Sequence, residues 1–387
     1  MSSIKITKPY LLEKDIYIYI CTKLVLGTDE EYDLWYSIEK EYKDYISVEH
    51  ADAFVVNLLF YAMEHKLDIE CETKISEKLY YQLTEYWIPS ITKNINKYNP
   101  IKIIAEVTDE KLPTAGAVGG SLSGGVDSFY TLLKHLDRKE SSYNITHLTF
   151  FNAGASGELG GDEARVKYQN RIAWIKDVAD NLGKKLICID TNINEFLKEN
   201  HLATHSCRTL ALPLLLQKLF SKYYFASGTD FANFRFDEES CCEYDLLNVH
   251  CFSTENLTFY SSGGEVNRLE KVKYISDFEV TYSRLNVCVA EDTNCSKCEK
   301  CQRTMMELYV LGKLEKYKEV FDLDYFARNK RRFLRTSSIN RYKDDWKEVY
   351  EILDSQDELG ILEKILFIRK MISKKLSLKK FFEKKRK

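Results

Sequence analysis

A loop rich in glycine and hydroxyl side chains is the first segment of this chain that could do chemistry. It runs from Ser121 to Ser128 with the sequence SLSGGVDS. Adjacent glycines let backbone N–H groups approach an anion, hydroxyls add donors, and a following helix presents its positive N-terminal end. Asp127 is a carboxylate of the kind that holds Mg²⁺ together with phosphate oxygens and water. Because the loop lacks the lysine of the Walker motif, it predicts phosphate binding without transfer of a terminal phosphoryl group.

A second candidate site is a group of four cysteines that lie close together in the sequence. They are Cys288, Cys295, Cys298 and Cys301. Four thiolates at short spacing suit a tetrahedral zinc ion, and a closed four-sulfur site leaves no position for a substrate, so we expect a structural role. An iron–sulfur cluster is the alternative. The remaining cysteines, including the adjacent Cys241 and Cys242, are interpreted as ordinary thiols.

The loop resembles the signature of the PP-loop ATP pyrophosphatases, which reads Ser-Gly-Gly-x-Asp-Ser after a strand of small residues. This resemblance implies an α/β fold with a doubly wound, mostly parallel sheet of the adenine nucleotide alpha hydrolase type. It also implies cleavage of ATP between the α- and β-phosphates, with adenylation of an acceptor. The residues that it assigns to ATP binding are Ser123, Gly124, Gly125, Val126, Asp127 and Ser128. Asp127, through Mg²⁺, and Ser128 are the catalytic candidates.

The cysteine group makes the resemblance more specific, because it points to one family among the PP-loop proteins. A PP-loop followed along the chain by a cysteine, a short gap, Cys-x-x-Cys-x-x-Cys and an arginine, here Arg303, is similar to the 7-cyano-7-deazaguanine synthase family. Members use ATP and ammonia to convert the carboxylate of 7-carboxy-7-deazaguanine into an amide and then a nitrile, and they contain zinc. By this resemblance Lys271 is a further catalytic candidate. The segment from Ser227 to Phe231 only loosely resembles the family's purine-binding segment, which leaves the acceptor open.

The segments around the loop alternate between strand and helix patterns. Strands are expected over 115–122, 145–151, 185–190 and 223–227, and helices over 128–136, 164–182 and 209–220. This succession predicts a parallel sheet covered by helices on both faces, with ligands at the carboxyl ends of its strands.

The rest of the chain indicates two further parts. Residues 1–113 combine strand patterns over 15–21 and 24–26 with helical periodicity over 51–65 and 76–87, which predicts an α+β accessory domain. Residues 114–310 form the expected PP-loop ATPase domain with the zinc site. Residues 311–387 are the expected helical, basic extension.

Two histidines and an arginine precede the helix expected from residue 209. His201 and His205 are spaced like residues on one helical face. A metal pair or a catalytic base is weighed against a surface or capping role, and the second is favoured because no acidic companion stands at a suitable spacing. Arg208 is expected either to meet a phosphate or carboxylate or to form a surface salt bridge. The segment from Ser261 to Glu265 is interpreted as a plain turn rather than a second anion loop.

Composition and charge limit the class of protein. The chain has 387 residues, of which 44% are hydrophobic and 30% charged, which excludes disordered and fibrous classes. It shows no apolar run of membrane-spanning length and no signal peptide, so we expect a cytoplasmic protein without a membrane partner. Residues 361–387 carry nine Lys and two Arg against two Glu. A solvated helical end is favoured there over binding of nucleic acid.

Together these observations predict an AMP-forming, ATP-dependent C–N ligase. It would adenylate a carboxylate, either 7-carboxy-7-deazaguanine or a related small molecule or protein acceptor, and ammonia or an amine would then give an amide or nitrile. ATP, Mg²⁺ and Zn²⁺ are the expected cofactors, and a homodimer is expected, with a possible partner protein. The alternatives are a PP-loop enzyme of tRNA thiolation, or a non-catalytic nucleotide-binding subunit of a multi-protein defence system.

Overall fold

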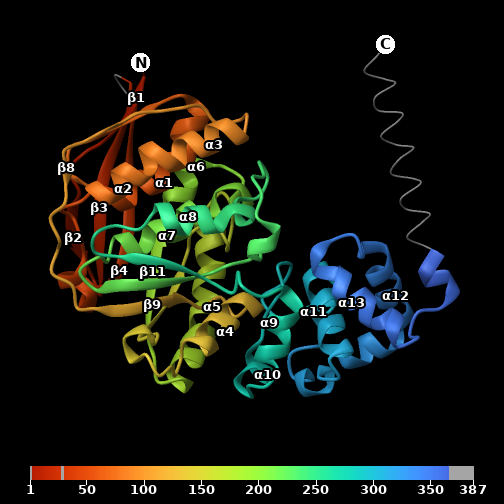
Figure 1. Ribbon diagram of the computed structural model, residues 1–387. Helices are drawn as coiled ribbons and strands as arrows, with labels where there is room; N and C mark the ends of the chain where they lie inside the picture. The colour runs from red at the N-terminus through yellow and green to blue at the C-terminus, as the bar shows by residue number, and fades with distance from the viewer. Residues whose placement is uncertain (1, 28–29, 366–387) are drawn as a thin grey trace, which may run out of the picture. The chain divides into compact units, whose positions relative to one another are not determined.

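The computed structural model describes residues 2–27 and 30–365 of the chain (Figure 1). Most of the basic segment, residues 366–387, therefore lies outside the described residues. The chain divides into two compact units. The first combines Met1–Ser123 with Asp127–Val266, and the second combines Gly124–Val126 with Asn267–Lys387. Each unit is described separately below.

The first unit is an α/β structure with a mostly parallel sheet at its centre. Its parallel strands are β9 (Ala117–Ser121), β10 (His147–Phe151), β11 (Lys185–Thr191), β12 (Phe220–Ala226) and β13 (Thr258–Ser262). They lie in the order β11-β10-β9-β12-β13. The helices of this region are α4 (Val126–Lys134), α5 (Gly161–Asn181), α6 (Ile193–Leu197), α7 (His201–Leu214) and α8 (Asp245–Cys251). The predicted alternation of strand and helix is confirmed, and β13 adds a strand that the sequence patterns did not indicate.

The N-terminal segment extends the same sheet. Its elements are β1 (Ser3–Ile6), β2 (Tyr10–Lys14), β3 (Tyr17–Leu26), β4 (Glu30–Glu39), α1 (Asp52–His65), β5 (Asp68–Cys71), β6 (Ile75–Ser76), α2 (Glu77–Gln82), α3 (Ile88–Asn94), β7 (Ile103–Ile104) and β8 (Val107–Thr108). β4 pairs antiparallel with β11, and α1 packs on α7. The segment expected to be an accessory domain therefore shares its sheet and core with the parallel strands.

One strand replaces the two predicted over 15–21 and 24–26. β3 continues from Tyr17 to Leu26 and pairs with β4 along its whole length. The polar Thr22 interrupts the apolar pattern, but its side chain is buried and donates a 2.7 Å hydrogen bond to the carbonyl of Thr7. Because this bond satisfies the hydroxyl, the strand passes through the core at a position where the sequence pattern indicated a break.

The helix predicted from residue 209 begins earlier, at His201. The side chain of Asn200 caps it by accepting hydrogen bonds from the backbone N–H groups of Leu202 and Ala203, at 2.8 and 3.3 Å. Asparagine is among the best N-cap residues because its side-chain oxygen satisfies donors of the first turn. His201, His205 and Arg208 consequently lie within α7 and not before it.

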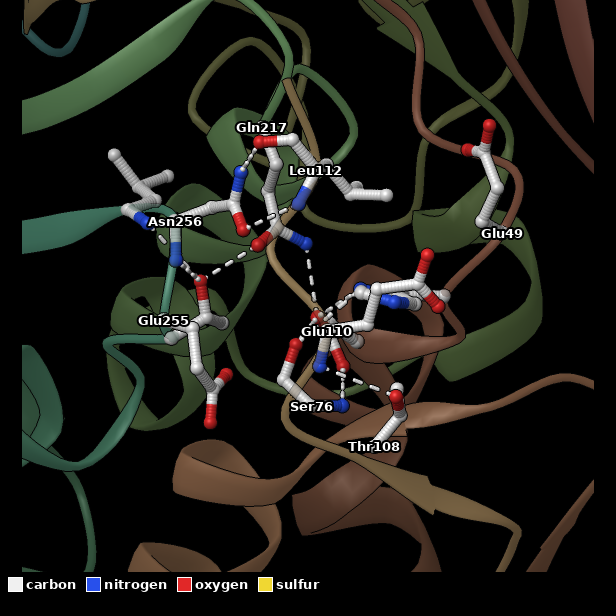
Figure 2. Close-up of polar contacts among 12 residues, drawn as sticks. Glu49, Ser76, Thr108, Glu110, Leu112, Gln217, Glu255 and Asn256 are labelled. Carbon is white, nitrogen blue, oxygen red and sulfur yellow. Dashed lines mark hydrogen bonds and ion pairs between the residues drawn. The ribbon is translucent and has the colours of Figure 1, made fainter. Parts of the chain in front are cut away.

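A buried polar network ties the N-terminal segment to the parallel region (Figure 2). Asp52, at the start of α1, accepts hydrogen bonds from the Ser76 backbone N–H at 2.9 Å and from the Gln217 side-chain amide at 2.8 Å. Gln217 in turn accepts a 2.6 Å bond from the Thr254 hydroxyl. These four residues are buried, so each bond is made in a setting where an unpaired polar group is costly.

Substitution of Gln217 by Leu should lower the free energy of unfolding by about 1–3 kcal/mol, because it removes partners from both Asp52 and Thr254. Urea unfolding followed by circular dichroism measures this change. Gln169→Leu, at an exposed position of α5, is the matched control and should change stability by less than about 0.5 kcal/mol. Equal effects of the two substitutions would show that the network does not hold these segments together.

The second unit is helical. It contains α9 (Arg268–Ile275), α10 (Val280–Arg284), α11 (Glu299–Val310), α12 (Leu323–Asn340) and α13 (Asp344–Ser355). α11 packs against α9, α12 and α13, and buried Met305, Phe333 and Trp346 lie in this core. Among the helices of residues 2–27 and 30–365, none is both long enough and apolar enough to cross a membrane.

Candidate functional site

The loop expected to bind phosphate follows β9, at the position where strand order reverses. The chain passes from β9 to β10 and β11 on one side and then returns to β12 on the other side of β9. In a doubly wound sheet the carboxyl ends of the strands at this reversal form the crevice in which ligands bind. Sequence and topology therefore indicate the same place.

The backbone of the loop is tightly fixed. Leu122 donates to the carbonyl of Thr149 in β10 at 2.9 Å, and Arg171 in α5 donates to the carbonyl of Ser123 at 3.3 Å. Gly124 has a φ of 83°, a left-handed conformation that strongly favours glycine. The hydroxyls of Ser123 and Ser128 are 3.2 Å apart. The loop thus brings together the hydroxyl of Ser123, which precedes α4, and the hydroxyl of Ser128, which lies in the first turn of α4.

A second segment reaches the same edge of the sheet after β12. If a Cβ atom stood on Gly228, it would lie 3.8 Å from the sulfur of Cys242. Burial is the main cause that raises the pKa of Cys242 to about 12, with a smaller contribution from the charge of Asp127. The charge of the loop carboxylate thus acts on the Cys242 thiol. Sequence patterns do not indicate this interaction, because more than a hundred residues separate the two positions.

Arg208 does not lie on the surface, so the expectation of a surface salt bridge is wrong. Its side chain is fully buried and donates to the side chain of Asn194 at 2.9 Å and to the carbonyl of Glu199 at 3.0 Å. Burial lowers the pKa of the guanidinium, which the charge of Glu199 partly offsets. Arg208 therefore holds the loop before α7 in place.

The segment after β13 is occupied by its own carboxylate. Glu265 accepts hydrogen bonds from the backbone N–H of Gly263 at 3.0 Å and from the Tyr130 hydroxyl at 2.9 Å, and it forms an ion pair with Lys134. A carboxylate in that position competes with any external anion. The interpretation as a turn is supported.

The four clustered cysteines come together in the second unit. Their sulfur atoms all lie within 4.8 Å of one another. Around a tetrahedral zinc ion with bonds of about 2.3 Å, two sulfurs are about 3.8 Å apart. The sulfurs of Cys288 and Cys298 are 3.9 Å apart. The cluster could therefore hold a metal ion such as zinc.

Backbone N–H groups near the cysteine cluster donate to its sulfur atoms. Cys298 caps α11 with its sulfur, and its own N–H donates to the sulfur of Cys295 at 3.2 Å. Burial alone would raise the pKa of Cys288, but N–H groups of Cys295, Glu291 and Ala290 reverse this and lower it to about 7. Backbone donors thus stabilise the thiolate form that a metal requires.

Replacing Cys298 by Ser should remove about one metal ion per chain and lower the melting temperature, because binding to a structural zinc site contributes directly to folding. Plasma mass spectrometry and thermal unfolding measure the two effects. Cys21→Ser on β3 is the control and should retain the metal. A Cys298→Ser protein with undiminished metal content would contradict the assignment of the cluster.

Lys271 lies in α9 of the second unit, where its side chain is 2% exposed. Arg303, which follows the cysteines in α11, forms an ion pair with Asp345. Neither observation tests the catalytic role inferred for Lys271, which stays a prediction.

Comparisons with protein-family models, with curated proteins and with solved structures found no match to this chain.

Proposed function

We propose that the chain is an AMP-forming, ATP-dependent C–N ligase with an adenine nucleotide alpha hydrolase type of fold. The observation that carries the proposal is the Ser-Gly-Gly-Val-Asp-Ser loop at the reversal of strand order. A loop of this composition favours phosphate by chemistry, and the crevice favours a ligand by topology. The two arguments are independent, since one rests on residue types and the other on strand pairing.

The loop residues have separate roles in this proposal. The hydroxyls of Ser123 and Ser128 and the backbone N–H groups of the two glycines would donate to the pyrophosphate part of ATP. Asp127, half-buried at the start of α4, would hold Mg²⁺ through its carboxylate. With Mg²⁺ present, charge on the leaving pyrophosphate would be neutralised without a lysine in the loop. Catalysis would then rest on positioning and electrostatic stabilisation.

The proposed reaction has two steps. A carboxylate oxygen of the acceptor attacks the α-phosphorus, the bond to the β-phosphate oxygen breaks, and pyrophosphate leaves. The nitrogen of ammonia or an amine then attacks the acyl carbon, AMP leaves with the bonding electrons, and a base takes the proton from nitrogen. The acceptor would be 7-carboxy-7-deazaguanine or a related carboxylate, including one on a protein. To form a nitrile, the amide oxygen would attack the α-phosphorus of a second ATP with loss of pyrophosphate. That oxygen would then leave with AMP, and the nitrogen would lose its two protons to a base.

Sulfur insertion into tRNA is the second candidate, and the thiol of Cys242 near the loop is the observation that favours it. A sulfur-carrying cysteine reacts as its thiolate. Burial, followed by the negative charges of Asp245, Glu243 and Asp127, raises the pKa of Cys242 to about 12, although a contact with Ser240 lowers it. The thiol is therefore poorly prepared to carry sulfur, and the ligase is better supported.

Incubation with Mg²⁺, α-labelled ATP, ammonium and 7-carboxy-7-deazaguanine tests the ligase. We expect AMP in proportion to the amide or nitrile formed. Ser128→Ala should reduce the rate about 10- to 100-fold, because it removes one hydrogen bond to a charged group. The exposed Ser141→Ala variant should retain wild-type activity.

The other products are equally informative. ADP and phosphate would contradict cleavage between the α- and β-phosphates. Bound ATP that is not consumed with any carboxylate would favour the non-catalytic subunit. Sulfur transfer to tRNA, measured with labelled sulfide, would favour thiolation.

A further inference from the structure

A cluster of three different metal-binding side chains lies near the loop, outside the four-cysteine group. His205 comes from the first half of α7, Cys242 from the short helix Cys241–Tyr244, and Asp245 from the first residue of α8. One potential ligand atom from each lies within 4.8 Å of the other two. Cys242 and Asp245 follow β12, so the fold brings them to the carboxyl edge of the sheet.

The spacing of the nitrogen and sulfur atoms matches a tetrahedral metal site. Bonds of about 2.1 Å to nitrogen and about 2.3 Å to sulfur place the two ligand atoms about 3.6 Å apart. In the structure His205 Nε2 and Cys242 Sγ are 3.5 Å apart. This separation suits two ligands of one ion, and Nδ1 of the same ring is 3.8 Å from the sulfur.

Asp245 is a buried carboxylate with an unused oxygen. The side chain is 2% exposed, and Oδ1 accepts a 2.5 Å hydrogen bond from the Ser206 hydroxyl. Within residues 2–27 and 30–365, the buried Oδ2 has no hydrogen-bond partner, although the backbone N–H of Gly228 lies close enough to the carboxylate to favour its charged form. An unpaired buried carboxylate oxygen is costly and calls for a cation or a donor.

The imidazole of His205 is oriented by a second layer of contacts. Its Nδ1 atom lies 2.9 Å from the sulfur of Cys241. That sulfur is itself held by the backbone N–H of Ser206 at 3.3 Å and lies 3.2 Å from the Ser206 hydroxyl. In metal sites the second ring nitrogen of a ligating histidine usually donates to a carboxylate, a backbone carbonyl or water, and here the Cys241 sulfur occupies that position.

We propose that His205, Cys242 and Asp245 bind a transition-metal ion, with Zn²⁺ as the ion that suits one nitrogen, one sulfur and one oxygen ligand. Unlike the closed four-sulfur group, a site with three protein ligands leaves a coordination position for a nitrogen or oxygen atom of a bound molecule. The proposal does not rest on the proposed ligase activity, because metal binding is measured without ATP.

Metal content of the full-length protein tests this site. After equilibration with excess Zn²⁺ and gel filtration, the wild type should retain about two zinc ions per chain, one for each site. Cys242→Ser and Asp245→Asn should each retain about one, whereas Cys251→Ser, which removes another buried thiol, should retain both. Circular dichroism would establish that each variant is folded.

Absorption spectroscopy of bound Co²⁺ is an independent test of the site. Co²⁺ added to zinc-loaded protein after mild chelation should produce a thiolate-to-cobalt absorption band that Cys242→Ser weakens and Cys251→Ser leaves unchanged. About one zinc ion per wild-type chain, unchanged in both Cys242→Ser and Asp245→Asn, would overturn the proposal. A cobalt band of equal intensity in the wild type and in folded Cys242→Ser protein would also overturn it, because cobalt in the four-cysteine group contributes equally to both proteins.

Discussion

The close pairing of β9 with β12 is the contact on which the candidate nucleotide site depends. A Cβ atom on Gly119 would lie 2.5 Å from the ring of Tyr223 in β12, so a side chain cannot be added there without displacing the ring. The Tyr223 hydroxyl and the Thr149 hydroxyl of β10 are 2.6 Å apart. The tyrosine therefore spans β9, and the small residues of this strand allow its two neighbours to close around it. The loop and its serines emerge from this packed strand in a fixed direction.

The two candidate metal sites are assembled in different ways. The four cysteines meet through turns of a short segment, with backbone N–H groups directed at their sulfurs. His205, Cys242 and Asp245 meet only because α7 leads into β12 and the segment after β12 returns over it. The first arrangement is a property of local sequence, whereas the second is a property of topology. This difference also separates a closed structural site from one with room for a ligand.

Much of the fold follows from sequence patterns, and the failures have physical causes. The strands and helices around the loop were predicted because their apolar residues repeat with clear periods. The break expected within β3 was wrong because Thr22 satisfies its hydroxyl in the core. Helix α7 begins before its predicted start at residue 209 because the side chain of Asn200 caps it there. No acidic residue stands at a suitable spacing from His205 in the sequence, and Asp245 provides the acidic companion from a distant segment. Such a contact requires the three-dimensional fold.

Binding of a nucleotide that cannot be cleaved tests the role of the loop as an ATP site without the need for an acceptor. Titration calorimetry with Mg²⁺ and α,β-methylene-ATP would compare the wild type with Gly124→Ala and Gly183→Ala. Both glycines have positive φ, 83° and 62°, so the two substitutions impose similar local strain, but only Gly124 lies in the loop. We predict saturable binding by the wild type, which Gly124→Ala weakens about 10-fold or more and Gly183→Ala leaves unchanged. Failure of the wild type to bind, or equal binding by all three proteins, would contradict this role of the loop.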